Sequence, residues 1–92
     1  MTMVNKMEHI LTSKSPTLDL HGEISSMVEV LVNTFILENY KKGENTVRII
    51  HGKSTNILTK ETHLVLKKNP YVEKYFLNNW NIGETVVYIK TV

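Results

Sequence analysis

The sequence contains no cysteine among its 92 residues. This absence excludes disulfide bonds, thiol nucleophiles and cysteine-ligated zinc, and it fits a reducing compartment. No apolar run approaches the ~20 residues that a membrane-spanning helix needs, and the first residues lack the apolar core of a signal peptide. We therefore expect a cytoplasmic protein without a membrane partner.

A large excess of one charge is also missing. The formal net charge is +2, with 22% charged and 41% hydrophobic residues, which is typical of one ordinary globular domain. A chain this short buries only ~60–65% of its unfolded surface, so we expect a thin, two-layer architecture. The mild positive charge permits a nucleic-acid partner but does not require one.

The first 16 residues are interpreted as an N-terminal arm or linker that can include a short helix, and this arm precedes a domain spanning residues 17–92. Their apolar side chains are spaced to line one side of a helix: Met3, Val4, Met7, Ile10 and Leu11. A helix that binds a partner is the alternative. The run Ser13-Lys14-Ser15-Pro16 then ends any regular pattern.

Two short stretches of strand character, residues 17–21 and 46–51, each end in His-Gly. His21 and His51 are 30 positions apart, which is the length of one strand-helix-strand crossover. Parallel neighbouring strands joined in this way end at the same edge of a sheet, where ligands of open α/β sheets bind. We therefore expect both imidazoles to point into one site.

The remaining pattern predicts a β-α-β-α-β-β order and a mixed four-stranded sheet with both helices on one face. Two helices are expected, over residues 23–42 and from a cap at Ser54 or Thr55 to residues 67–70. Strands are expected at residues 71–77 and 85–90, joined by a loop over residues 78–83. The expected inner face of the first helix is Ile24, Met27, Val28, Leu31 and Phe35, widened by Val32 and Ile36, and that of the second is Ile57, Leu58, Leu64 and Val65.

Three motifs together resemble the Smr (small MutS-related) domain: Leu18-Asp19-Leu20-His21-Gly22, His51-Gly52-Lys53 and Gly83-Glu84-Thr85-Val86-Val87-Tyr88-Ile89. The resemblance implies a two-layer α/β sandwich like the C-terminal domain of translation initiation factor 3. It also implies nicking of DNA or cleavage of RNA without an obligatory metal or cofactor. Such domains occur at the end of the second bacterial MutS paralogue, as stand-alone proteins, or in proteins that act on messenger RNA at stalled ribosomes.

The resemblance assigns catalytic roles to Asp19, His21, His51 and Lys53. His21 is expected to be a general base or acid oriented by Asp19, and Lys53 is expected to hold the phosphate. His51 is expected to be the counterpart of His21 or a substrate contact, with a buried structural role as the alternative. A metal site is not expected, because Asp19 is the only evident third ligand beside the two histidines.

The chain departs from the family pattern at Ser54 and Asn56, and again at Trp80 and Asn81, where glycine is usual. A glycine loop lets backbone N–H groups approach phosphate closely. The alternative to an endonuclease is therefore a non-catalytic module that binds nucleic acid or the ribosome through a degenerate glycine loop. A protein-interaction domain is a third possibility.

RNA or branched or single-stranded DNA is the expected partner, and the expected contacts are Arg48, Gly52, Lys53, Ser54, Thr55, Lys60 and Trp80. Further lysines, namely Lys41, Lys42, Lys67 and Lys68, extend this basic face, or else they only complement helix dipoles. Tyr71, Tyr75 and Trp80 are expected either to stack on unpaired bases or to be half-buried core. His9 and His63 have no evident partner and are interpreted as surface residues.

Overall fold

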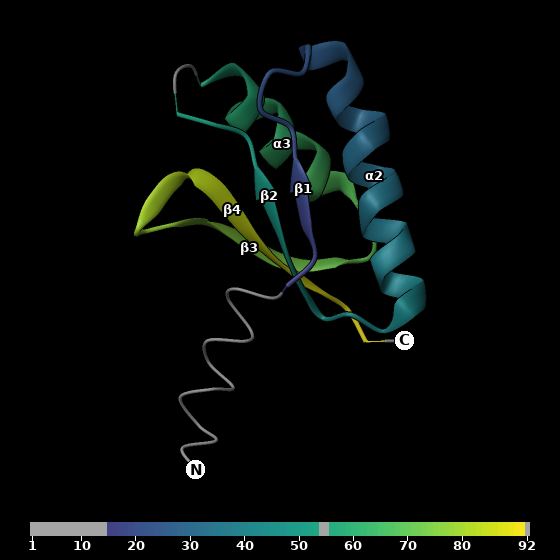
Figure 1. The fold of residues 1–92 in the computed structure, drawn as a ribbon. Coiled ribbons are helices and arrows are strands. Elements are labelled where there is room, and N and C mark those ends of the chain that lie inside the picture. The colour runs from purple at the N-terminus through teal and green to yellow at the C-terminus, as the bar shows by residue number, and fades with distance from the viewer. Residues whose placement is uncertain (1–14, 54–55, 92) are drawn as a thin grey trace.

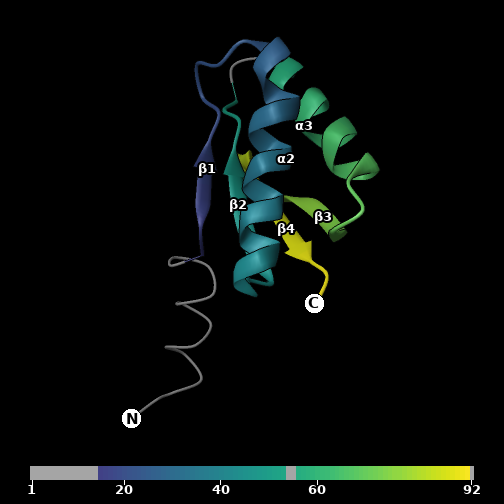
Figure 2. The ribbon, with the colours of Figure 1, turned by 90° about the vertical axis from the view of Figure 1, so that its right-hand side faces the viewer.

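The computed structural model describes residues 15–53 and 56–91. Its elements are β1 (Thr17–Asp19), α2 (Ser25–Lys42), β2 (Thr46–Ile50), α3 (Ile57–Lys68), β3 (Val72–Asn78) and β4 (Asn81–Ile89). The sheet order is β1-β2-β4-β3; β1 and β2 are parallel, and the other two pairs are antiparallel. Both helices cover one face of this sheet (Figures 1 and 2). The predicted two-layer α/β sandwich is therefore confirmed.

In the described part of the chain, no helix has the length and apolar character that crossing a membrane requires. Residues 1–14 of the predicted N-terminal arm, His9 among them, and the predicted cap residues Ser54 and Thr55 lie outside the described residues. The N-cap of α3 is Asn56, one residue beyond the expected cap.

The helix α2 ends as predicted but begins two residues late. Ile24 is still extended, with φ −85° and ψ 149°, so Glu23 lies before the helix rather than in its first turn. At the other end Gly43 has a φ of 81°, and its N–H donates to the carbonyl of Tyr40. This left-handed glycine cap stops the helix directly after Lys42.

The core lies between the sheet and one stripe of each helix. From α2 this stripe is Val28, Val32 and Ile36, all predicted and all fully buried, and the predicted Leu31 and Phe35 pack against it. The prediction was wrong for Ile24 and Met27, which are exposed at the start of the helix, because the buried stripe begins only at Val28 and repeats every four residues.

The inner stripe of α3 also differs from the prediction. Leu58, Thr62, Val65 and Leu66 face the core, while Ile57 and Leu64 are exposed. These four positions have helical spacing, but the pattern was hidden because one of them is a threonine. Two large apolar side chains of α3 are consequently left at the surface.

The predicted loop over residues 78–83 is wrong, because β3 and β4 form a hairpin joined only by Asn79 and Trp80. The Asn78 side chain accepts a hydrogen bond from the N–H of Trp80 at 2.9 Å. The Asn81 side chain accepts one from the N–H of Gly83 at 3.1 Å. Asparagine side chains therefore accept hydrogen bonds from the backbone N–H groups of this turn.

Candidate functional site

The carboxyl ends of β1 and β2 lie side by side, as the repeated His-Gly pattern predicted. The strands are parallel, and the N–H of Leu20 donates to the carbonyl of Ile50 at 2.7 Å. His21 and His51 directly follow this bonded pair, and β1 and β2 both end toward the top of Figure 1. The backbone thus brings both motifs to one edge of the sheet.

The first motif is a tight turn that exposes His21. The carboxylate of Asp19 accepts a hydrogen bond from the backbone N–H of His21 at 2.9 Å. Gly22 has a φ of 88°, and the N–H of Glu23 donates a hydrogen bond to the carbonyl of Leu20 at 2.9 Å. Asp19 therefore fixes the backbone that presents the imidazole, rather than bonding to the ring.

The ring of His51 is buried, with only 3% of the residue exposed. Its Nδ1 lies 2.8 Å from the hydroxyl of Thr59 and 3.2 Å from the carbonyl of Gly52. Its Nε2 lies 2.8 Å from the hydroxyl of Thr85. The expectation that both imidazoles open to solvent is wrong for His51, and the geometry favours the structural role that the sequence left as an alternative.

The same threonine holds a second histidine, His63, which sequence reasoning treated as a surface residue without a partner. Nε2 of His63 lies 2.8 Å from the hydroxyl of Thr85, and its ring centroid lies 6.1 Å from that of His51. The ring also packs on Tyr75 at 5.0 Å. One signal was present in the sequence: Thr59 and His63 are four residues apart, which places them on one face of α3.

These contacts define the proton positions in the neutral state. The Gly52 carbonyl can only accept, so Nδ1 of His51 carries the proton, and Nε2 of His51 accepts from the hydroxyl of Thr85. The oxygen of Thr85 then accepts from Nε2–H of His63. We call His51, Thr59, His63 and Thr85 the histidine cluster.

Burial lowers the pKa of both cluster histidines. For His51 the loss of hydration dominates, and the Gly52 carbonyl and the Glu84 carboxylate partly oppose it. For His63 burial again dominates, and the positive charge that His51 would carry lowers the pKa further. Both rings are therefore neutral near pH 7.

The His51-Gly52-Lys53 segment is fastened to β4. The N–H groups of His51 and Gly52 both donate to the carbonyl of Gly83, at 2.9 and 3.0 Å. A Cβ atom on Gly83 would lie 3.1 Å from Cγ of Lys53, so the stem of this lysine passes directly over the glycine. Lys53 is exposed, and it follows β2 at the edge of the sheet where β1 and β2 end.

The other expected nucleic-acid contacts are spread over the molecule. Arg48 is engaged internally, with its guanidinium 3.3 Å from the carboxylate of Glu84 and 3.2 Å from the hydroxyl of Thr17. Lys60 is exposed on the first turn of α3, and Trp80 is 96% exposed at the tip of the hairpin. Among the expected contacts that the structure describes, Lys60 and Trp80 thus join Lys53 as exposed groups.

The other two aromatic residues considered for base stacking, Tyr71 and Tyr75, are half-buried. Tyr71 packs on Tyr40 with ring centroids 4.4 Å apart, and Tyr75 packs on His63. Within residues 15–53 and 56–91, no group of three His, Asp or Glu side chains has the arrangement of a metal site.

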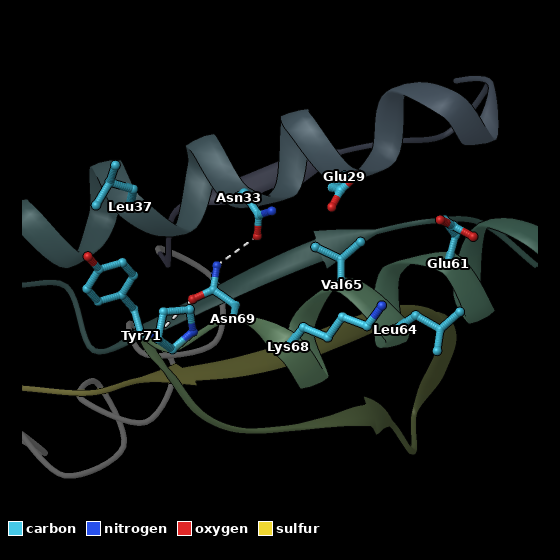
Figure 3. A pocket seen from close by; sticks show the side chains of 10 residues that line it. Glu29, Asn33, Leu37, Glu61, Leu64, Val65, Lys68, Asn69 and Tyr71 are labelled. Atoms are coloured by element: carbon cyan, nitrogen blue, oxygen red, sulfur yellow. Dashed lines mark hydrogen bonds between the residues drawn. The ribbon is translucent and has the colours of Figure 1, made fainter.

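A groove of about 470 Å³ lies between α2 and α3, away from the residues predicted from the motifs (Figure 3). Within it the side-chain amide of Asn69 donates to that of Asn33 at 2.8 Å. Glu29 and Glu61 line its other end. With two carboxylates in its wall, this groove is a poor site for a nucleic-acid phosphate.

Comparison with known proteins agrees with the motifs. The Smr domain family model matches residues 18–90. Endonuclease MutS2 of Halothermothrix orenii is 39% identical over 75 residues, and that of Ligilactobacillus salivarius is 42% identical over 79 residues. These matches cover 82% and 83% of this chain but only 10% of each relative, so the chain spans about a tenth of their length.

Solved structures show the same fold. The Smr domain of Thermus thermophilus MutS2 superposes with a TM-score of 0.78 at 26% identity, covering 82% of this chain and 98% of that one. YdaL, a stand-alone small MutS-related protein from Escherichia coli, gives a TM-score of 0.79 at 22% identity, covering 92% of this chain and 74% of that one.

Proposed function

The chain belongs to the Smr domain family, and from this premise we propose that it is an endonuclease-type domain that binds nucleic acid and cleaves its phosphodiester bonds. The observation that carries the proposal is the pair of exposed basic side chains, His21 and Lys53, on neighbouring loops where β1 and β2 end. Relatives named as endonucleases match over this region, which supports the same reaction class.

In the proposed reaction the imidazole of His21 accepts the proton of the attacking oxygen as that oxygen bonds to phosphorus. The nucleophile is the 2′-hydroxyl of RNA, or a water molecule when the substrate is DNA. The bond from phosphorus to the leaving oxygen breaks, and the leaving oxygen takes a proton from water at the open edge. The ammonium of Lys53 stabilises the negative charge that builds on the phosphoryl oxygens.

Asp19 and His51 act as positioning residues in this proposal. Asp19 holds the turn that presents His21, through the bond to its backbone N–H. His51 is buried and bonded through both ring nitrogens, so it acts by fixing the segment that carries Lys53. Gly52, Ser54 and Thr55 complete the proposed phosphate-binding segment, in which the φ of 86° at Gly52 sets the chain direction.

The test is cleavage of single-stranded RNA and of branched DNA by purified protein in EDTA. We expect cleavage by the wild type, loss of cleavage in His21→Ala, and retention of nucleic-acid binding in this variant. His9→Ala is the matched control, because it removes a histidine from outside the motifs. Equal cleavage by the wild type and His21→Ala would point to a contaminating nuclease and overturn the assignment.

The second candidate is a module that binds nucleic acid or the ribosome without cleaving. The burial of His51 favours it, because this ring has no free nitrogen to serve as the second acid or base. The double variant Ser54→Gly, Asn56→Gly separates the two candidates. Cleavage that appears only in the double variant, at unchanged affinity, would mark the natural chain as the non-catalytic module.

A further inference from the structure

A second groove, of about 370 Å³, lies between α3 and β3. Its apolar wall is formed by Leu64, Tyr75 and Leu77, and Lys60 and Lys67 also line it. Leu64 is 53% exposed and Leu77 is 37% exposed, although both are large aliphatic side chains. In the part of the chain that the structure describes, nothing covers this apolar surface.

The groove adjoins the proposed site through the histidine cluster. Thr59 lines the groove and contacts Nδ1 of His51, and His63 lines it and donates to Thr85. Lys53 precedes the same helix that forms the groove wall. The groove therefore begins at the first turn of α3, the end of the helix that Lys53 precedes.

The charged side chains that line the groove are two lysines, Lys60 and Lys67. Lys60 and Lys67 are both exposed and seven residues apart, which places them on one side of α3 about 10 Å apart. Among residues 15–53 and 56–91, no acidic side chain lines the groove. Its ligand should therefore combine an apolar, planar part with negative charge spaced along its length.

An unpaired nucleotide has this combination. Its base can lie on the apolar wall beside the Tyr75 and His63 rings, while the adjoining phosphates approach the two lysines. In a duplex the base faces are stacked and are not available to such a groove. We propose that the groove between α3 and β3 binds an unpaired base of a single-stranded nucleic acid whose backbone continues to His21 and Lys53.

This inference rests on the proposed function and names its substrate class: a single-stranded segment next to the bond that is cut. A preference for single strands over duplex follows, since only an unpaired base fills the groove. Binding and cleavage are separable in the test, because the groove residues lie outside the group assigned to proton transfer.

The first experiment measures binding of a single-stranded ten-nucleotide RNA by fluorescence anisotropy, in the His21→Ala background so that the probe stays intact. Leu64→Glu places a carboxylate in the groove and is expected to weaken binding at least tenfold. Val30→Glu is the matched control, because Val30 is 54% exposed on α2 and does not line the groove. We expect the control to weaken binding less than twofold.

The second experiment reports the position of the base. A base lying against Leu64 and Leu77 shifts their methyl NMR signals upfield by ring currents, and a duplex of the same sequence leaves these signals in place. Equal affinities for Leu64→Glu and Val30→Glu together with unmoved methyl signals would overturn the groove assignment. Cleavage by the wild type would still stand in that case, so failure of the groove and failure of the nuclease proposal are distinguishable.

Discussion

At the scale of single residues, the hydroxyl of Thr85 is the central contact of the histidine cluster. It lies 2.8 Å from Nε2 of His51 and 2.8 Å from Nε2 of His63, and Thr85 is fully buried. Thr85→Val keeps the shape but leaves two imidazole nitrogens without partners. We expect the free energy of unfolding, measured by urea denaturation, to fall by about 1–3 kcal/mol.

Thr62 provides the matched control with the opposite sign. It is also fully buried, but its hydroxyl has no hydrogen-bond partner among the described residues. Thr62→Val removes an unsatisfied polar group and should raise the free energy of unfolding by up to about 1 kcal/mol. Similar effects of both substitutions would show that the Thr85 bonds contribute nothing specific.

The histidine cluster also makes stability depend on pH. The pKa values of His51 and His63 are lowered in the folded chain, mainly by burial, so folding favours their neutral forms. The unfolded chain therefore binds more protons than the folded chain below the ordinary histidine value of 6.5. We expect the free energy of unfolding to be highest above pH 6.5 and to fall as the solution is acidified, in urea titrations at pH 7.5, 6.5 and 5.5.

A substitution of one cluster histidine tests the origin of this slope. His63→Gln removes one titrating group and should make the loss of stability on acidification smaller. If the slope in His63→Gln equalled that of the wild type, the cluster would not be the source of the pH dependence.

At the scale of elements, the close packing of β4 under the Gly52-Lys53 segment depends on Gly83. A Cβ atom there would lie 3.1 Å from Cγ of Lys53 and 3.2 Å from the backbone carbon of Gly52. Gly83→Ala should therefore displace this segment. Because a small displacement of a group that positions the substrate slows the reaction, we expect the proposed cleavage rate to fall by about tenfold. The measurement is cleavage of single-stranded RNA at saturating substrate.

Gly43→Ala controls for stability in that experiment. Gly43 has a φ of 81° at the end of α2 and no atom within 4 Å of its missing Cβ, so alanine is strained there without touching the site. It should cost about 1–2 kcal/mol of stability and leave cleavage unchanged. A loss of cleavage in Gly43→Ala equal to that in Gly83→Ala would assign the effect to general destabilisation.

The elements themselves could be predicted from sequence where the signal is local. The glycine and lysines that end α2 are adjacent in the chain, and the parallel arrangement of β1 and β2 followed from one crossover length. The direction of the His51 ring could not be predicted, because Thr85 is 34 residues away and belongs to another element. The inner face of α3 was missed for a related reason, since burial of Thr62 depends on the sheet beneath it.

At the scale of the whole molecule, the polar groups that hold the strands together are different from the charged groups that are exposed to a ligand. The histidine cluster and the Arg48–Glu84 ion pair use polar groups internally, so they hold the strands and leave no charge for a ligand. Lys53, Lys60 and Lys67 remain exposed along α3 and the segment before it. The net charge of +2 therefore understates how positive this one side is.

The salt dependence of binding follows from this arrangement. If Lys53, Lys60 and Lys67 each neutralise one phosphate of a single strand, log K should fall with log salt with a slope of about −2. Raising KCl fourfold, from about 50 to about 200 mM, should then weaken binding roughly 15-fold. Lys60→Gln with Lys67→Gln should bring the slope to about −0.7, whereas Lys41→Gln with Lys42→Gln, at the end of α2, should leave it unchanged. An affinity that does not change with salt would show that these lysines contact no phosphate.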